Sequence, residues 1–180
     1  MRIISGFLRG RRFYPPADKW PTRPTTDIAK EGLYNILQNQ IDFESSVFLD
    51  LFGGTGNHCY EFISRGCVDA TYVDKHKPAV NFVRKTAKDL GIESSLKIYG
   101  MDVFSFIKNH DKKFSVIFAG PPYDLYQLPE LPDLIMNSEL PDEEGLFILE
   151  HNPNHDFQTH SDFDQVRNYG ETHFSFFYKK

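Results

Sequence analysis

Short apolar runs alternate with amphipathic stretches along most of this chain, and this alternation constrains the fold more than any other feature. Buried strands are predicted at Val47–Leu51, Ala70–Asp74, Leu96–Tyr99, Phe114–Phe118 and Leu146–Glu150. Helices are predicted at Asp27–Leu37, Asn57–Arg65, Pro78–Leu90, Asp102–Ile107 and Leu131–Ser138. Strands that alternate with helices imply an α/β fold with a mostly parallel sheet covered on both faces. Ligand-binding residues are then expected at the carboxyl ends of the strands.

The two ends of the chain depart from this alternation. The segments Arg2–Ser5 and Arg11–Tyr14 predict an N-terminal β-hairpin, and prolines keep the following linker extended. Gln165–Tyr169 and His173–Tyr178, separated by a glycine, predict a second hairpin. A length of 180 residues suits one domain with a single large core. We therefore predict one domain over residues 1–180, in which residues 1–26 form a basic hairpin and linker.

Positive charge is concentrated at the N-terminus. The chain has a formal net charge of −5, yet seven of its 20 lysines and arginines lie in the first 30 residues, beside only Asp18 and Asp27. Phosphate contacts supply much of the affinity of proteins for nucleic acids, so a basic arm on an acidic body favours a polyanion bound at one place. A solvated hairpin without a partner is the alternative.

The sequence lacks the patterns of membrane, secreted and metal-binding proteins. No apolar run approaches the roughly 18 residues of a membrane span, and the first residues lack the apolar stretch of a signal peptide. We therefore expect a cytoplasmic protein with no membrane partner. Cys59 and Cys67 have no CxxC spacing and are predicted to be buried core residues. His151, His155 and His160 do not share a helical face, so no metal site is expected.

A glycine loop follows the first predicted strand. Gly53, Gly54 and Gly56 would let the backbone approach a ligand closely at the start of a helix. Asp74 ends the second strand, where its carboxylate can accept hydrogen bonds from ribose hydroxyls. Dinucleotide sites and S-adenosylmethionine sites share this arrangement. Cys59 stands where the third small residue of a GxGxxG loop would be, which disfavours a dinucleotide.

Two further residues at strand ends are candidates for the same site. Asp50, at the end of the first strand, suits a cationic methyl donor, either directly or through the amides of the loop. Asp102 lies just after the third strand, where its carboxylate or the Val103 amide could meet the edge of an adenine. A helix N-cap is an equally good interpretation of Asp102.

The segment VIFAGPPYDL, at Val116–Leu125, places two prolines and a tyrosine directly after the fourth strand. Adjacent prolines cannot continue a sheet and fix their own backbone. Pro121 and Pro122 would therefore direct carbonyl oxygens and the Tyr123 ring toward one point at the carboxyl edge of the sheet. A planar base that carries an NH2 group can be held in this way, which indicates methyl transfer to an amino group.

Several motifs resemble one family over essentially the whole chain. They are VFLDLFGGTG, SRG at Ser64–Gly66, GPPYDL, MRIISGFLRGRRFYPP and TRPTTDIAKEGLYNIL. The chain resembles the bacterial 16S ribosomal RNA guanine-N2 methyltransferase family, and the opening segment and the Arg-Pro-Thr-x-Asp motif at Arg23–Asp27 are its most specific parts. The resemblance implies a Rossmann-like class I methyltransferase fold with a seven-stranded, mostly parallel sheet. It further implies S-adenosylmethionine as donor and methylation of a guanine N2 in 16S ribosomal RNA, free or in the small ribosomal subunit. Separately, we expect a monomer.

The resemblance also assigns roles to individual residues. Asp50, Gly53, Gly54 and Gly56 match the donor loop, Asp74 the ribose acid, Asp102 with Val103 the adenine contact, and Gly120, Pro121, Pro122 and Tyr123 the catalytic turn. Arg2, Arg9, Arg11, Arg12 and Arg23 are the implied RNA contacts.

Gly120 departs from the family, which has Asp or Asn before the prolines. Without that side chain the substrate amine lacks one hydrogen-bond acceptor. The proline carbonyls with a water or Asp124 could compensate, the chain could bind RNA or donor without turnover, or the sequence could carry a change at this position. If an acceptor is missing, Gly120→Asp should raise the rate. A DNA or protein amide methyltransferase is the other alternative, and the basic arm disfavours protein amides.

Overall fold

The computed structural model of the chain describes residues 1–21 and 23–180. Its strands form one sheet in the order β3-β2-β1-β4-β5-β7-β6. The strands are β1 (Val47–Leu51), β2 (Asp69–Val73), β3 (Leu96–Tyr99), β4 (Phe114–Ala119), β5 (Pro141–His151), β6 (Phe163–Tyr169) and β7 (Thr172–Tyr178). Strands β1 to β5 are parallel, and β7 runs antiparallel between β5 and β6. The strand order reverses between β1 and β4, and a ligand crevice is expected at such a reversal.

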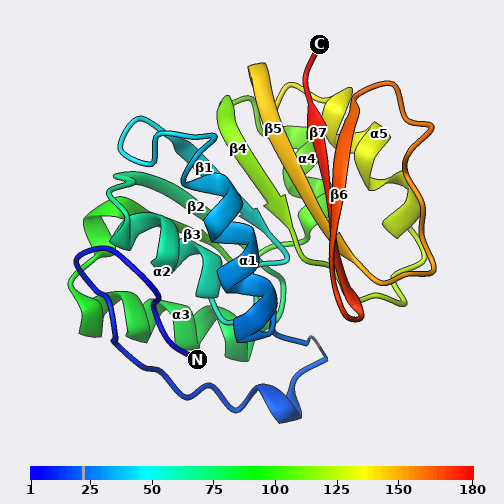
Figure 1. Ribbon diagram of the computed structural model, residues 1–180. Helices are drawn as coiled ribbons and strands as arrows, with labels where there is room; N and C mark the ends of the chain where they lie inside the picture. Colours follow the sequence, from blue (N-terminus) through cyan, green and yellow to red (C-terminus); the bar gives the residue numbers. More distant parts are fainter. Residues whose placement is uncertain (22) are drawn as a thin grey trace.

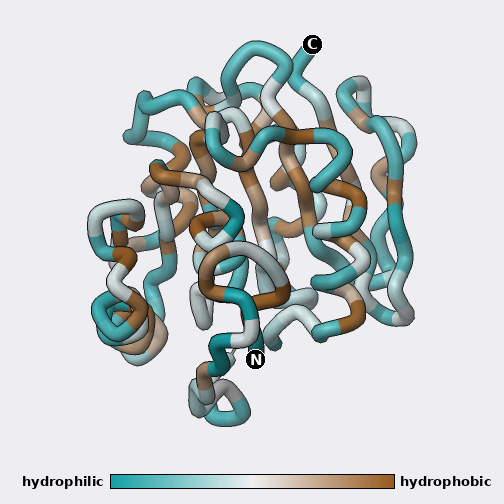
Figure 2. Tube along the Cα trace, turned by 60° about the vertical axis from the view of Figure 1, so that its left-hand side comes forward, coloured by the Kyte–Doolittle hydropathy of each residue, from teal (hydrophilic) through white to brown (hydrophobic). Residues whose placement is uncertain are grey.

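Helices cover both faces of the sheet (Figure 1). On one face lie α1 (Asp27–Leu37), α2 (Asn57–Ser64) and α3 (Lys77–Leu90), and on the other α4 (Val103–Asn109) and α5 (Leu131–Met136). The short 3-10 turns are η1 (Ala17–Lys19), η2 (Glu93–Ser95) and η3 (Leu128–Glu130). Successive side chains of a strand point to opposite faces, so Phe48 joins the hydrophobic core under α1–α3 and Leu49 the core under α4 and α5. Figure 2 shows hydrophobic residues concentrated along the inner strands. The three-layer α/β fold predicted from the sequence is confirmed.

The predicted element bounds hold best where apolar periodicity is strong. The helix Asp27–Leu37 and the strands Val47–Leu51 and Leu96–Tyr99 occur as predicted. Strand β5 begins earlier than predicted, at Pro141, because its exposed residues Asp142–Glu144 carry no apolar signal. These residues lie within the register shift between the pairs that Phe114 and Val116 form with β5, and Glu144 adopts a left-handed φ of 58°.

The predicted N-terminal hairpin is present, but the predicted strands Arg2–Ser5 and Arg11–Tyr14 do not form. Only Arg2 and Arg12 pair as an isolated antiparallel bridge. The buried Glu61 carboxylate on α2 accepts hydrogen bonds from the amides of Ile4, at 2.9 Å, and Ser5, at 3.1 Å. The ladder ends where the turn begins, because the Ile3 carbonyl accepts the Gly10 amide and the Arg11 amide donates to the Leu8 carbonyl.

Helix α2 also fixes the position of the hairpin loop. Leu8 is buried, and its amide donates to the Ser64 hydroxyl at 3.0 Å. Gly6 has a φ of 86° and lies so close to α2 that an added Cβ would be 1.7 Å from the Ser64 carbonyl oxygen. Figure 1 shows this N-terminal segment and the linker at the end of the molecule where β4 and β5 finish. Within the described residues, no helix is long and apolar enough to cross a membrane.

Candidate active site

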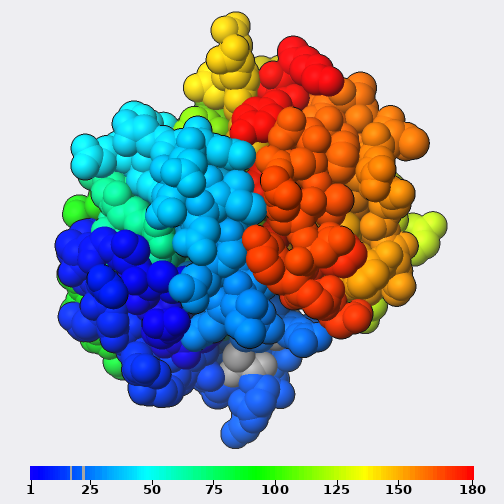
Figure 3. Space-filling view, in the orientation of Figure 1, coloured from blue at the N-terminus to red at the C-terminus, as the bar shows by residue number. Residues whose placement is uncertain are grey.

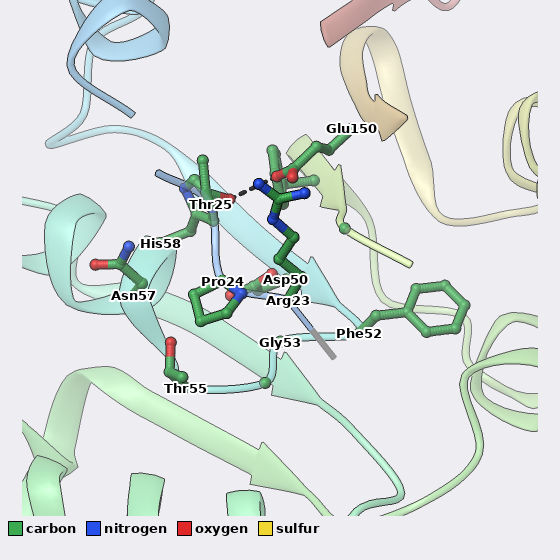
Figure 4. A pocket seen from close by; sticks show the side chains of 13 residues that line it. Arg23, Pro24, Thr25, Asp50, Phe52, Gly53, Thr55, Asn57, His58 and Glu150 are labelled. Carbon is green, nitrogen blue, oxygen red and sulfur yellow. Dashed lines mark hydrogen bonds between the residues drawn. The ribbon is translucent and has the colours of Figure 1, made fainter. Parts of the chain in front are cut away.

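A pocket lies where the carboxyl ends of β1, β4 and β5 meet (Figure 4). Asp50 and Gly53 line it from the end of β1, Gly120 from the end of β4 and Glu150 from β5. The linker closes it from the opposite side through residues 23–25. The structure therefore brings the first-strand acid, the glycine loop and the start of the Pro-Pro turn together, as the sequence predicts.

The glycine loop after β1 is held in a close approach to β2. A Cβ on Gly53 would lie 2.4 Å from the Tyr72 ring, so only glycine fits there. The Tyr72 hydroxyl donates to the Gly54 carbonyl at 2.7 Å. Phe52 has a φ of 58°, which is unusual for a bulky residue and marks local backbone strain at this loop. Gly56, with a φ of 79°, begins α2.

Asp74 braces this loop. Its carboxylate accepts the Gly54 amide at 2.9 Å and the His76 amide at 2.8 Å, and the side chain is buried. Sequence reasoning predicts Asp74 as a ribose acid but misses this loop contact. A carboxylate has about four lone-pair sites, so the two amide bonds leave acceptor capacity for a ligand.

Asp50 is a buried acid without a cationic partner. Among residues 1–21 and 23–180, no Lys, Arg or His lies within ion-pair distance of it. Its contact is the Cys59 thiol, 3.5 Å from Oδ2. The pKa of Asp50 is raised to about 8, chiefly by burial; the hydrogen bond from the Cys59 thiol opposes the shift, and the neighbouring Asp74 and Glu150 carboxylates add to it. A buried acid of this kind is suited to a cationic ligand.

Asp102 serves as the N-cap of α4. Its carboxylate accepts the Ser105 amide at 3.0 Å, and Val103 is buried behind it. Of the two interpretations open from the sequence, the structure shows the cap. An adenine contact by Asp102 or the Val103 amide stays a prediction.

The Pro-Pro turn leaves β4 through Gly120, whose amide donates to the Leu51 carbonyl at 3.2 Å. The Pro122 carbonyl accepts the Leu125 amide at 3.0 Å, which closes the turn. The Tyr123 hydroxyl donates to Glu150 Oε1 at 2.8 Å. Burial, then the Glu150 carboxylate, raises the pKa of Tyr123, so the phenol stays protonated as a donor.

Glu150 is the site residue that sequence reasoning missed. It is 4 % exposed, and Thr25 donates to its Oε2 at 2.5 Å. Thr26 caps α1, whereas the neighbouring Thr25 turns to Glu150. An acid at the end of a predicted buried strand, like Asp50 and Asp74, was the available signal.

The hydrogen bonds to Glu150 continue into the protein. Thr25 Oγ1 lies 3.1 Å from His58 Nε2, and Tyr34 Oη lies 3.1 Å from His58 Nδ1. Burial, then Lys30, lowers the pKa of His58 to about 3, so the ring is neutral. Because the single Thr25 proton goes to Glu150, we assign the His58 proton to Nε2, with Tyr34 donating to Nδ1.

The predicted RNA-binding arginines fall into three groups. Arg9, Arg11 and Arg12 are exposed on the N-terminal loop, and none forms an ion pair within the part of the chain that is described. Figure 3 shows the N-terminal residues gathered on one flank of the molecule. Arg2 instead pairs with Asp27 at 3.3 Å and, at the longer distance of 3.8 Å, with Glu31. Arg23 lines the pocket, and its side chain extends toward Glu150 in Figure 4.

The cysteines and His151 lie outside the pocket. Cys59 and Cys67 are buried free thiols, as predicted. His151 Nε2 bonds to the Ser175 hydroxyl at 2.7 Å. Within the described residues, no group of three or more His, Cys, Asp or Glu side chains could hold a metal ion.

The glycine loop after β1, the acid after β2 and the Pro-Pro turn after β4, on this strand order, define a class I methyltransferase fold. A profile of the family described as conserved hypothetical protein 95 matches residues 1–178. The chain belongs to this family, that of ribosomal RNA small subunit methyltransferase D.

Named relatives and solved structures agree with this assignment. The rRNA methyltransferase YlbH of Bacillus subtilis is 33% identical over 84% of this chain and 82% of its own length. Ribosomal RNA small subunit methyltransferase D of Escherichia coli is 28% identical over 83% of this chain and 74% of its own.

Among solved structures, a Thermus thermophilus protein, TTHA0928, has a TM-score of 0.85 and 26% identity over 98% of both chains. The T. thermophilus 16S rRNA N2 G1207 methyltransferase, in complex with AdoMet and guanosine, has a TM-score of 0.69 and 19% identity over 87% of this chain and 44% of its own. The second likeness is one of fold alone.

Proposed function

We propose that this protein transfers a methyl group from S-adenosylmethionine to the exocyclic N2 amine of a guanine in 16S ribosomal RNA. The observation that carries the proposal is that Asp50, the glycine loop and Gly120, the residue before the Pro-Pro turn, line one pocket. The ribosomal RNA methyltransferases among its relatives support the substrate class. The motif resemblance supports guanine N2.

The residues of the pocket fit a cationic nucleoside donor. Asp50 offers a buried carboxylate that lacks a cation within the described residues, and Gly53 keeps the loop backbone packed against the Tyr72 ring. Asp74 would accept hydrogen bonds from the ribose, and Asp102 with Val103 would lie at the adenine. The donor supplies an activated methyl group, so the protein contributes chiefly alignment and acceptors for the amine.

The Pro-Pro turn would hold the acceptor base. Tyr123 would stack on a guanine turned out of its helix or loop, and the Pro121 carbonyl would accept one amine hydrogen. The Tyr123 hydroxyl is bonded to Glu150, and this contact fixes the direction of the ring. Pro122 keeps the turn from continuing as sheet.

The N-terminal loop would bind the RNA backbone. Arg9, Arg11 and Arg12 are exposed, and the N-terminal segment that carries them lies at the end of the molecule where β4 and β5 finish (Figure 1), so phosphates held there would place a nearby base at the Pro-Pro turn. Arg23 would act inside the pocket, and Arg2, already paired with acids of α1, would contribute less. We further propose that the protein works in the cytoplasm, as a monomer, on the small ribosomal subunit or its free RNA.

A transfer assay with labelled methyl groups tests this function. The protein is offered small ribosomal subunits, naked 16S RNA, duplex DNA and a glutamine-containing peptide, and the modified nucleotide is identified by mass spectrometry. Label on guanine N2 of ribosomal RNA is expected. Label on DNA or peptide alone would contradict the proposal and favour the other amino-methyltransferases.

A non-catalytic binder is the second candidate function, favoured by Gly120. It predicts donor and RNA binding without label on any of these substrates.

A further inference from the structure

We infer that Glu150 supplies the acceptor for the substrate amine that Gly120 does not carry. The inference rests on the proposed methyl transfer and assigns a catalytic residue to it. It starts from the position of the Glu150 carboxylate, which lines the pocket together with Gly120.

Glu150 occupies the space that a side chain at position 120 would enter. An ideal Cβ built on Gly120 lies 3.8 Å from Glu150 Oε2. The oxygens of an Asp or Asn reach about 2.4 Å beyond Cβ, given ordinary bond lengths. An acid or amide at position 120 that pointed this way would therefore meet Oε2. The carboxylate from β5 stands where the side chain from β4 would end.

The surrounding hydrogen bonds present Glu150 as an acceptor. Tyr123 donates to Oε1 and Thr25 donates to Oε2. Each oxygen has a second lone pair, so the carboxylate can still accept from a substrate. His58, neutral and donating to Thr25, keeps the Thr25 proton directed at Glu150.

Two charge effects compete at Glu150. Burial raises its pKa, whereas the hydrogen bonds from Thr25 and Tyr123, and then the charge of Arg23, lower it. Burial is the largest of these effects, so the pKa of Glu150 is raised overall, while Thr25, Tyr123 and Arg23 oppose that shift. Asp50 is the other acid facing this space.

The alternative acceptor, Asp124, is exposed and is not part of the pocket lining. The proline carbonyls of the turn can take one amine hydrogen but leave the second without a partner. Glu150 is therefore the buried acceptor that the structure offers for it.

The chemical step balances with Glu150 in this role. The guanine N2 lone pair forms the N–CH3 bond while the S–CH3 bond breaks, and the bonding pair stays on sulfur, which becomes a neutral thioether. The nitrogen loses one proton to Glu150, which passes it to solvent. A charge-assisted hydrogen bond in this step is worth roughly ten- to a hundredfold in rate.

The test compares single-turnover methylation rates of small ribosomal subunits or 16S RNA. Glu150→Gln is expected to be roughly ten- to a hundredfold slower than the wild type, with donor affinity within about twofold by calorimetry because the donor is bound by other residues. Glu143→Gln, an exposed change on the same strand, is the matched control and should keep the wild-type rate. A Glu150→Gln rate equal to that of the control would overturn the inference.

A second pair of variants does not depend on whether Glu150→Gln folds. Gly120→Asp places a second carboxylate against Glu150, so it should be no faster than Gly120→Ala, which adds only the Cβ beside Phe118, 3.1 Å away. The sequence alone predicts the opposite result, a higher rate for Gly120→Asp. If Gly120→Asp is several-fold faster than both Gly120→Ala and the wild type, an acceptor was missing and the inference fails. If the wild type itself labels no RNA, it is the proposed function that fails.

Discussion

The acids at the carboxyl edge of the sheet differ in what surrounds them, and that difference sets what each can do. Asp74 receives two backbone amides, Glu150 receives two hydroxyls, and Asp50 receives one thiol. The weakest donor is at Asp50, and the pKa of that acid is raised to about 8. Asp50 is therefore the acid whose charge state depends most on a ligand.

At the scale of this residue, we expect the free energy of unfolding to depend on pH. The folded pKa of Asp50 lies above the unfolded value of about 3.9, so its contribution is complete below about pH 4 and is lost as pH rises through about 8. Glu150 contributes a slope of the same sign. Asp50→Asn should thus be more stable than the wild type at pH 8.5 and similar at pH 4 in urea unfolding.

The same group should make donor binding pH-dependent in the opposite sense. Ionised Asp50 attracts a cation, so affinity for S-adenosylmethionine should increase from pH 6 to 8 in the wild type and much less in Asp50→Asn, by calorimetry. A wild-type affinity that is flat over this range would contradict a direct role for Asp50.

Asp74 has two functions that one substitution removes together. Asp74→Ala should weaken S-adenosylmethionine binding by about 1.5 to 3 kcal/mol, the range for hydrogen bonds to a charged group. It should also loosen the loop, because the Gly54 and His76 amides lose their acceptor. Titration calorimetry measures the first effect and amide hydrogen exchange at Gly54 the second. Unchanged affinity would remove Asp74 from the ligand site.

At the scale of elements, one buried acid joins the N-terminal arm, α1 and α2. Glu61 is fully buried and forms ion pairs with Lys30 and Arg65, each at 2.9 Å, besides accepting the amides of Ile4 and Ser5. Lys30 also donates to the Arg2 carbonyl. Glu61 thus holds the first five residues of the arm, in addition to the contacts of the hairpin loop with Ser64.

Removing this acid should release the arm. Glu61→Gln leaves the buried Lys30 ammonium without its carboxylate, so the free energy of unfolding should fall by about 3–5 kcal/mol. Hydrogen exchange at Ile4 and Ser5 should accelerate. Glu93→Gln, an exposed change, serves as the control. Protection at Ile4 equal to the control would show that another contact holds the arm.

The same elements show what a sequence can and cannot predict. Helix α1 and strand β1 are predictable because their apolar spacing matches what they bury. The bonding of the Ile4 and Ser5 amides is not, since they donate to Glu61, more than fifty residues away in the chain. The site follows the same division. The glycine loop and the Pro-Pro turn are local motifs. Thr25 and Glu150, by contrast, are 125 residues apart in the sequence, and the sheet brings them into contact.

At the scale of the whole molecule, charge is segregated. The net charge is −5, while the exposed Arg9, Arg11 and Arg12 lie together on the N-terminal loop. The net negative charge repels RNA at long range, whereas these three arginines attract it locally, which would orient the bound strand. The segregation therefore predicts that basic residues on the N-terminal loop contribute more to RNA affinity than basic residues elsewhere on the surface.

Replacing Arg9, Arg11 and Arg12 with Ala should reduce the slope of log RNA affinity against log salt by up to about 2 to 3, because each phosphate contact contributes roughly 0.7 to 0.9. The matched control replaces the exposed Arg84, Lys88 and Lys97 with Ala, which changes the net charge equally. A general charge effect would alter both variants alike, whereas a specific arm contact alters only the first. Donor affinity should be unchanged in both, since neither set lines the pocket. Equal slopes in the two variants would move the RNA site away from the N-terminal loop.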